Sequence, residues 1–479
     1  MLQRREFLRR SIGLGAVVAV AGCRMNRLGF GNGGLMQDYA FKGLSGKKVR
    51  VGFVGIGARG TAAVHRVSLI PGVEIVALCD KRQVRIDENL KWLREHHYAI
   101  APTAYAGAEA YKQLCDFGNC DVIYCATPWE LHQPVAMRAL CGGKIALVEV
   151  TSALTTEQCW ELVETSERFR IPCMQLENCV YGEIELLELN MARLGMFGEI
   201  AHAEGAYIHD LRHVSRSEPG IGEWEWRYQE NLVHKGNRYP THGLTPICQT
   251  LGINRGDRLD YLVSLESNQY SLDYYRHNGG MAVGDPRRGD AVTEMGDMNI
   301  TLIKTVNGRS IMIQHDVSSP RPYNRLAFIS GTKGAMGDYP FRCAFETKCG
   351  DRKAHAWFDE KQAEDIRKKY MHPLWRDVSE VAQKVGGHGG MDFIMDLRWA
   401  YCLQNGLPLD MDVYDLAVTS CICELTETSV RNGSKPVSIP DFTRGNWKNV
   451  KPWGVVNVDL RKMGFDKRSV TSDDSALSV

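Results

Sequence analysis

The feature that most constrains the fold of this chain is a glycine-rich turn that follows a short apolar run near its start. The run Val49–Val54 is rich in β-branched residues, which predicts a strand buried on both faces. Gly55, Gly57 and Gly60 follow it in the pattern G-x-G-x-x-G. In this pattern the first glycine allows a tight turn, the second lets the backbone approach a pyrophosphate, and the third lets the next helix pack closely. The segment therefore predicts dinucleotide binding rather than an ordinary glycine turn.

A carboxylate at the end of the next apolar run bears on the choice of dinucleotide. The run Val73–Leu78 leads to Asp80, which stands 20 residues after Gly60. At the tip of a strand a carboxylate can accept hydrogen bonds from the adenosine ribose, and it repels the 2′-phosphate of NADP. Lys81 and Arg82 follow directly and would offset part of that repulsion. The pattern favours NAD and leaves NADP as the alternative.

Beyond Asp80, short apolar runs alternate with helical patterns. The predicted strands are 121–126, 144–150 and 172–176, and the predicted helices are 84–96, 134–140 and 157–168. Such alternation predicts a parallel, right-handed α/β sheet. Residues 48–178 are therefore expected to form a Rossmann domain that binds its ligand at the carboxyl ends of the strands.

The pattern changes near Gly198, and a chain of 479 residues is in any case longer than one core usually serves. Long alternating runs then follow, with no helix expected between most of them, at 200–209, 259–266, 298–306, 310–317 and 326–331. They predict an open, mainly antiparallel sheet. Helical periodicity returns at 391–404 and 412–431. We therefore expect an α/β domain followed by an α+β substrate domain over residues 179–445, with its last helices packing back, and a partly disordered extension over 446–479.

Residues 1–23 have the layout of an export signal. Arg4 and Arg5 precede a short apolar segment and resemble a twin-arginine signal, and the segment ends in a lipobox-like Val-Ala-Gly-Cys at Cys23. These features predict export by the twin-arginine route, which carries folded proteins, and lipidation of Cys23 in the bacterial cell envelope. Residues 24–47 would then be a tether. An amphipathic amino-terminal helix is the alternative.

Charge and cysteine content weigh against two kinds of site. The 58 basic and 57 acidic residues give a net charge of +1, so nothing suggests a nucleic-acid partner. No apolar run reaches the roughly 20 residues that span a bilayer, so membrane contact is expected only through the lipid anchor. The 15 cysteines include no C-x-x-C pair and no zinc spacing, so no metal site is predicted. Several lie in apolar runs and are expected to be buried, although an oxidising compartment would permit disulfides.

Motifs along the chain resemble a known family. Ala126-Thr127-Pro128 with His132 after one predicted strand, and Glu149 after the next, resembles the Gfo/Idh/MocA oxidoreductase superfamily. Longer motifs resemble its glycoside hydrolase family 109 branch: Glu177-Asn178, Trp226-Arg227-Tyr228, 239–244, 253–258, 387–393 and 405–410. The superfamily's dehydrogenases usually carry Glu-Lys-Pro where this chain has Glu149-Val150-Thr151. The missing lysine favours the hydrolase branch, whereas Thr151 departs from both groups.

The resemblance implies an NAD-dependent glycosidase, typed by α-N-acetylgalactosaminidase, that acts on the terminal sugar of a glycan or glycoconjugate. Its implied mechanism is not that of paired carboxylates. NAD takes a hydride from sugar C3, the C2 proton becomes acidic, the aglycone leaves from C1, water adds, and the hydride returns. An NAD-dependent sugar oxidoreductase and a sugar-binding lipoprotein with a vestigial site are the alternatives, and a homo-oligomer stays open.

The resemblance also implies the site residues. His242 would handle the C3 hydroxyl proton with help from Tyr239, Tyr181 would remove the C2 proton if cations lower the pKa of its phenol, and Glu149 would orient nicotinamide or sugar. The cofactor contacts would be Gly55, Gly57, Ala58, Arg59, Gly60, Asp80, Trp129, Glu130, Leu131, His132, Glu149, Val150 and Asn178. The substrate contacts would be Tyr207, Arg227, Tyr239, Pro240, Thr241, His242 and Tyr323. A loop histidine, a core tyrosine and a helix cap are the structural alternatives for His242, Tyr181 and Glu149. His388 would line the same cleft or form a turn.

Overall fold

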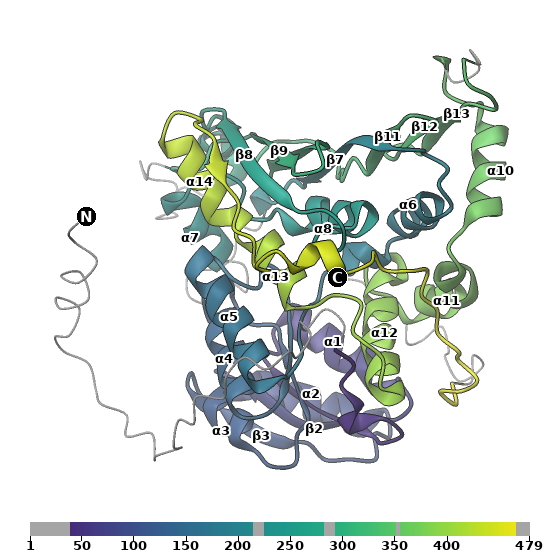
Figure 1. Ribbon diagram of the computed structural model, residues 1–479. Helices are drawn as coiled ribbons and strands as arrows, with labels where there is room; N and C mark the ends of the chain where they lie inside the picture. Colours follow the sequence, from purple (N-terminus) through teal and green to yellow (C-terminus); the bar gives the residue numbers. More distant parts are fainter. Residues whose placement is uncertain (1–38, 214–224, 282–292, 351–354, 466–479) are drawn as a thin grey trace, which may run out of the picture. The chain divides into compact units, whose positions relative to one another are not determined.

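The computed structural model describes residues 39–213, 225–281, 293–350 and 355–465 (Figure 1). The predicted export signal with Cys23 and residues 466–479 of the predicted carboxyl-terminal extension lie outside these residues. Among the residues described, no helix combines the length and the apolar character needed to cross a bilayer.

The amino-terminal half forms a six-stranded sheet in the order β3-β2-β1-β4-β5-β6. Its strands are β1 Val49–Val54, β2 Val73–Asp80, β3 Thr103–Ala106, β4 Val122–Cys125, β5 Ile145–Val148 and β6 Cys173–Gln175. All neighbours are parallel, so the predicted Rossmann domain is confirmed. The chain order reverses between β1 and β4, which puts the glycine turn after β1 at the switch point where such sheets bind ligands. Only β3 escaped prediction, because this short edge strand is mostly exposed and has no apolar run.

Five helices connect these strands: α1 Ala58–Ser68, α2 Gln83–Glu95, α3 Ala110–Asp116, α4 His132–Cys141 and α5 Thr156–Phe169. Helices α2, α4 and α5 lie close to the predicted ranges, whereas α3 was not predicted. Helix α5 begins where expected because the Thr155 side chain accepts a hydrogen bond from the backbone N–H of Gln158. Short helical turns occur at Lys42–Leu44, Trp129–Leu131, Asn178–Tyr181, Arg276–Gly280, His388–Gly390 and Asn446–Asn449.

The second half builds an eight-stranded sheet in the order β13-β12-β11-β7-β10-β9-β8-β14. The strands are β7 Ile200–Ile208, β8 Leu259–Glu266, β9 Asn299–Thr305, β10 Ser310–Asp316, β11 Phe328–Gly331, β12 Gly334–Gly337, β13 Arg342–Phe345 and β14 Val437–Ser438. Every pair is antiparallel except β7 with β10. The prediction of a mainly antiparallel sheet is therefore confirmed.

Helices are more frequent in this half than the sequence suggested. They are α6 Glu183–Arg193, α7 Glu225–Val233, α8 Thr241–Leu251, α9 Ser271–Tyr275, α10 Glu360–Tyr370, α11 Pro373–Val385, α12 Met391–Asn405, α13 Val413–Ser420 and α14 Ile422–Arg431. The expectation of few helices between the strands is wrong between β7 and β9, where α7, α8 and α9 lie. Helix α8 was missed because all its residues except His242 are buried, which leaves no polar face to reveal a helical period.

Helix α8 crosses β7 at unusually close range. A Cβ atom at Gly205 would lie 2.2 Å from the carbonyl oxygen of Gly243, and one at Gly243 would lie 2.5 Å from the backbone nitrogen of Ala206. Only glycine at both positions lets the two backbones touch in this way. The contact fixes the start of α8 against the strand that carries Tyr207.

All cysteines in the described part of the chain are free thiols, and all but Cys141 and Cys349 are buried. Their predicted burial is confirmed. None of these thiols is joined in a disulfide, so the packed core, rather than covalent bridges, holds these elements together.

Candidate active site

The glycine turn has the geometry that a pyrophosphate requires. Gly55 has a φ of +82°, and a Cβ atom on Gly60 would lie only 1.9 Å from the carbonyl oxygen of Gly55. The turn therefore cannot carry side chains at these two positions, so its backbone can approach a phosphate. NAD fits this cradle.

Asp80 holds this turn in place as well as marking the ribose position. One carboxylate oxygen accepts a hydrogen bond from the backbone N–H of Ile56 at 3.0 Å, and the other accepts one from Arg82 at 2.9 Å. Each carboxylate oxygen has a further lone pair that a ribose hydroxyl can use. Asp80 is buried and holds the turn, and its contact with the ribose stays a prediction.

Three predicted or suspected site residues converge on Asp392, which the sequence analysis did not single out, and Glu149 joins them through Arg59. The guanidinium of Arg59 donates to Glu149 at 2.7 Å and to Asp392 at 2.5 Å. The amide of Asn178 donates to the other oxygen of Asp392 at 2.5 Å, and Nδ1 of His388 lies 2.9 Å from that carboxylate. These contacts join the turn after β1, the end of β5, the turn after β6 and the first turn of α12.

Asp392 is 1% exposed and carries its charge inside the protein. Burial alone raises the pKa of its carboxyl, but Arg59, Arg66 and His388 outweigh that effect and hold the pKa well below its usual range. The ionised Asp392 therefore holds Arg59 and Asn178 at the nucleotide edge. The only sequence signal for this role is its place in the glycine-rich motif before α12. In the same network Glu149 pairs with Arg59 and does not cap a helix.

The loops after β4 and β5 are tied together by His132. Its two ring nitrogens lie 2.7 Å from the carbonyl oxygens of Thr127 and Thr151, and burial lowers its pKa to about 4. The indole N–H of Trp129 also donates to the carbonyl of Val150, at 3.1 Å. Both ring nitrogens face these loops, and the contact of His132 with the cofactor stays a prediction. His132 positions the loops, whereas Glu130 is exposed and Leu131 is half-buried beside them.

His242 and Glu177 form a dyad in which Glu177 is buried and His242 is half-buried. Nδ1 of His242 lies 2.6 Å from the carboxylate of Glu177, which also accepts a hydrogen bond from the backbone N–H of Cys179. Burial raises the pKa of Glu177, but His242, Thr241 and the backbone N–H of Cys179 outweigh burial and lower it overall. Glu177 is therefore ionised and holds the Nδ1 proton, so Nε2 is the nitrogen that can take or give a proton.

His242 lies in the first turn of α8 and not in a loop. Within the described residues its Nε2 has no hydrogen-bond partner. Glu177 was visible in the sequence only as part of a motif after a predicted strand, and its role as orienting group was missed. Pro240 and Thr241 are buried at the start of the helix and position His242, and their contact with the substrate stays a prediction.

A metal ion is a second use to which this dyad could be put. Ligand atoms of Glu177, Cys179 and His242 lie within 4.8 Å of one another. The Nδ1 to carboxylate contact of 2.6 Å is, however, that of a hydrogen bond, and burial raises the pKa of the Cys179 thiol well above its usual value. A protonated thiol is a poor ligand, so the donor set suits proton transfer better than metal binding.

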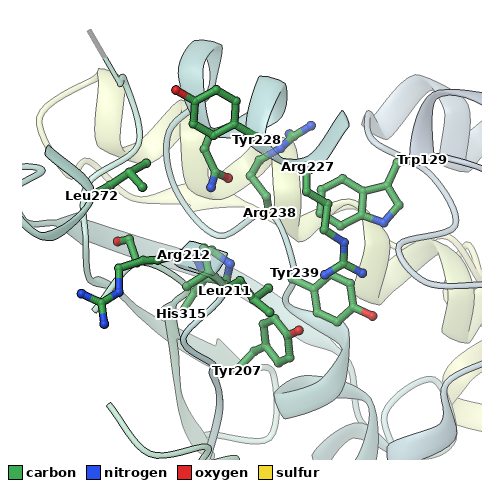
Figure 2. Close-up of a pocket in the computed structure, with 13 residues that line it drawn as sticks. Trp129, Tyr207, Leu211, Arg212, Arg227, Tyr228, Arg238, Tyr239, Leu272 and His315 are labelled. Carbon is green, nitrogen blue, oxygen red and sulfur yellow. The ribbon is translucent and has the colours of Figure 1, made fainter. Parts of the chain in front are cut away.

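Aromatic rings surround the dyad. The ring centroids of Tyr239 and Tyr207 lie 4.7 and 5.2 Å from that of His242, and 4.5 Å from each other. The Arg227 guanidinium lies 5.0 Å from the Tyr239 ring and 5.3 Å from that of Trp129. Figure 2 shows Trp129, Tyr207, Arg227 and Tyr239 gathered around one pocket. The structure thus brings most of the predicted substrate residues together, with Tyr323 at the edge, 6.4 Å from Tyr207.

Tyr207 and Tyr239 act as donors and not as bases. Burial raises the pKa of both phenols, and the nearby Arg227 offsets this only in part. Their hydroxyls are therefore protonated at neutral pH. That of Tyr239 forms no hydrogen bond with another residue described by the structure, so it can donate to a sugar oxygen.

The structure contradicts the role predicted for Tyr181. Its hydroxyl donates to Asp410 at 3.0 Å, inside a buried cluster with Arg398. The pKa of Tyr181 is raised well above its usual value, by burial and by Asp410. The condition for a phenolate base is therefore absent, and Tyr181 is a core tyrosine.

Two family models match the chain. The model "Oxidoreductase family, NAD-binding Rossmann fold" matches residues 49–174, and the model "Glycosyl hydrolase 109, C-terminal domain" matches residues 181–449. Together they span most of both sheets, whereas Glu177 and Asn178 lie in the short gap between the two matches.

Relatives with assigned names match most of the chain. An α-N-acetylgalactosaminidase from Bacteroides fragilis is 46% identical over 404 residues, which cover 84% of this chain and 93% of that protein. Glycosyl hydrolase family 109 protein 1 from Bacteroides thetaiotaomicron is 44% identical over 420 residues, which cover 84% of this chain and 86% of that one.

Solved structures with much lower identity share the fold. A levoglucosan dehydrogenase in complex with NADH and L-sorbose has a TM-score of 0.62 at 16% identity, covering 82% of this chain and all of that one. An NAD binding oxidoreductase from Klebsiella pneumoniae has a TM-score of 0.61 at 16% identity, covering 82% and 99%. These likenesses confirm the predicted architecture of a Rossmann domain followed by a sheet domain.

Proposed function

This chain belongs to glycoside hydrolase family 109, and from that premise we propose that it is an NAD-dependent glycosidase that releases terminal α-linked N-acetylgalactosamine from glycans or glycoconjugates. The observation that carries this proposal is the Glu177–His242 dyad, in which Glu177 is buried. Aromatic side chains surround the dyad, and they lie next to the loops of the nucleotide-binding sheet. Trp129 belongs to one of those loops and its ring lies 5.7 Å from that of Tyr239. The hydride-transfer and sugar-binding groups therefore meet at one place.

The residues of the chain fit NAD through the Gly55–Gly60 cradle, Asp80 and the Arg59–Asn178–Asp392 network. When bound, NAD would accept a hydride from sugar C3 and later return it to the sugar, so the overall hydrolysis is redox-neutral. His242 takes the proton of the C3 hydroxyl through Nε2, and the ionised Glu177 stabilises the imidazolium that results. At the second half of the cycle the same histidine returns that proton.

Arg227, Tyr207 and Tyr239 hold the sugar and donate to oxygens on which negative charge develops. Loss of the C2 proton beside a C3 ketone places charge on the ketone oxygen, and fixed donors in a site closed to water stabilise such charge strongly. Tyr239 is suited to this because its protonated hydroxyl has no partner among the described residues. The position of Arg227 over the Tyr239 and Trp129 rings adds positive charge at the same place.

The test of the function is a screen of nitrophenyl glycosides of both anomers with the purified protein. We expect release of nitrophenol from the α-N-acetylgalactosaminide by protein that purifies with NAD bound, without net reduction of added NAD. Absorbance at the nicotinamide band measures the latter. Reduction of one NAD for each sugar consumed would contradict the hydrolase and favour the sugar oxidoreductase.

The same assay in D₂O separates elimination from direct displacement at C1. Elimination removes and restores the C2 proton, so the released sugar should carry deuterium at C2, which mass spectrometry detects. Product with only protium at C2 would reject the elimination route, unless the abstracting group returns the same proton. Substrate deuterated at C2 decides between these two explanations, because a returned proton would retain the label.

We further propose that the protein is exported by the twin-arginine route and anchored through a lipid on Cys23, on the support of the motifs in residues 1–23. Replacing Arg4 and Arg5 by lysine should block export, whereas the same change at Arg9 and Arg10 is the matched control and should not. Replacing Cys23 by serine should release the exported protein from membranes. Cell fractionation measures both effects, and a wild-type protein that takes up no labelled palmitate would exclude the anchor.

A further inference from the structure

One histidine in the pocket plays no part in the chemistry described so far. His315 lies on β10, directly opposite Tyr207 on β7, and because these neighbours are in register their side chains stand on the same face of the sheet. The two rings are stacked with centroids 6.3 Å apart. The pocket is lined by both of these rings, by Tyr239 and by Arg227, but by neither His242 nor Glu177 (Figure 2).

His315 is a buried polar group without a partner from the protein. It is 3% exposed, and neither of its ring nitrogens bonds to any residue of the described chain. The ring nitrogens are not among the fully buried polar atoms of the described chain, so they are reached from the pocket that the ring lines, where the polar group of an occupant can bond to them. Burial lowers the pKa of His315 to about 3, and Arg238 and Arg227 contribute to the lowering. The ring is thus neutral, with one donor and one acceptor nitrogen.

The rest of the lining limits what the occupant can be. Leu211, Leu272 and Val317 supply apolar surface, and Trp129 closes one side. The polar side chains of Arg212, Asn231 and Ser318 also line the pocket, which therefore matches an occupant with a small apolar group beside a polar group that donates and accepts. An acetamido group has a methyl, an N–H and a carbonyl. An ammonium group at the same place would be repelled by Arg227 and Arg238.

We propose that His315 is a substrate-binding residue and that its pocket recognises the N-acyl group on C2 of the sugar, with the methyl against the aliphatic side chains and the amide against the imidazole. This proposal rests on the proposed glycosidase function. Carbon C2 is bonded to C3, whose hydroxyl is assigned to His242, and Tyr207 contacts the rings of both histidines, at 5.2 and 6.3 Å. Only the Tyr207 side chain lies between the two histidines, so a substituent on C2 that extends past its ring would reach His315.

The test compares two substrates that differ only at C2, nitrophenyl α-N-acetylgalactosaminide and nitrophenyl α-galactoside. His315→Phe keeps the ring and its stacking on Tyr207 but removes both nitrogens. It should lower kcat/KM about 10–100-fold for the N-acetyl substrate, chiefly through KM, and about 2-fold or less for the galactoside. His315→Gln, which keeps a donor and an acceptor, should recover most of the loss. His202→Gln is the matched control, because His202 lies on β7 with Nδ1 bonded to Ser310 outside the pocket.

An equal loss for both substrates, or no loss for either, would overturn the role of His315. If His315→Phe does not fold, His315→Ala should show the same selectivity. Calorimetry with N-acetylgalactosamine and galactose, on NAD-loaded protein, separates this proposal from the function on which it rests. A wild-type protein that hydrolyses no glycoside but binds N-acetylgalactosamine in a His315-dependent manner would refute the hydrolase and support the pocket. A wild-type protein that hydrolyses the glycoside, together with a His315 variant that binds N-acetylgalactosamine equally well, would support the hydrolase and refute the role of the pocket.

Discussion

Replacing His242 by alanine is expected to lower turnover about 10²–10⁴-fold, the usual effect of losing a positioned acid or base, while NAD stays bound. The reason lies in the dyad: Glu177 occupies Nδ1 at 2.6 Å, so Nε2 is the nitrogen directed to the substrate. Steady-state kinetics with calorimetric measurement of NAD affinity check both halves of the prediction. The variant should recover more activity on a substrate already oxidised at C3, because that substrate needs no first proton transfer.

Two further variants make the result specific to the dyad. Glu177→Gln keeps a group beside His242 but removes the charge that stabilises its imidazolium, so it should lower kcat less and shift the pH at which activity is half-maximal. Tyr181→Phe is the control, because that hydroxyl bonds to Asp410 and not to the site. Equal losses in Tyr181→Phe and His242→Ala would restore the tyrosine as a candidate base and contradict the geometry.

Asp392→Ala should weaken NAD binding and destabilise the fold together. The change leaves Arg59 without one of its two partners, removes a neighbour 3.6 Å from the buried Arg66, and frees the Asn178 amide. Breaking a buried ion pair on one side commonly costs about 3–5 kcal/mol of unfolding free energy. Denaturant unfolding measures the stability, and calorimetry measures NAD affinity.

A milder variant separates the two effects. Asp392→Asn keeps the size of the side chain and a hydrogen bond to Asn178 but loses the charge. NAD affinity should therefore fall more in this variant than in a surface variant. Asp365→Ala, which removes an exposed ion pair with Lys361, is the matched surface control and should change neither quantity appreciably. Unchanged NAD affinity in both Asp392 variants would show that this network only supports the fold.

The depressed pKa of Asp392 also predicts how stability depends on pH. Its folded-state pKa is below that of an unfolded aspartate, about 3.9, so the network contributes fully above that pH. The contribution falls as pH drops below about 4 and through the folded-state pKa. In acid unfolding, Asp392→Asn should therefore remove part of the stability loss that the wild type shows in this range.

Local patterns were enough to predict the Rossmann domain. The prediction of the segment from β1 to Asp80 depends only on residues that are close in sequence. These are β-branched side chains for the strand, glycines where a Cβ atom would collide, and a carboxylate at the end of the next strand. The alternation of elements then permits few topologies, because parallel strands need right-handed crossovers. The same holds for the main strands of the second sheet, whose apolar residues recur at every second position. Helix α8 escaped because burial on all sides removes the period that a sequence pattern can reveal.

Residue patterns along the chain were thus sufficient to predict the class of fold, the dinucleotide turn and, through the motifs, the family. Which charged and aromatic groups meet depends instead on how the elements pack. Asp392 lies 333 positions from Arg59, and Glu177 lies 65 positions from His242, so no local spacing encodes either pair. The order of strands sets such encounters: His315 faces Tyr207 because β10 lies parallel beside β7. Tyr181 turned from a candidate base into a core residue for the same reason, since its neighbours Asp410 and Arg398 come from a distant part of the chain. Ionisation follows burial and partners, and both exist only after the elements have packed.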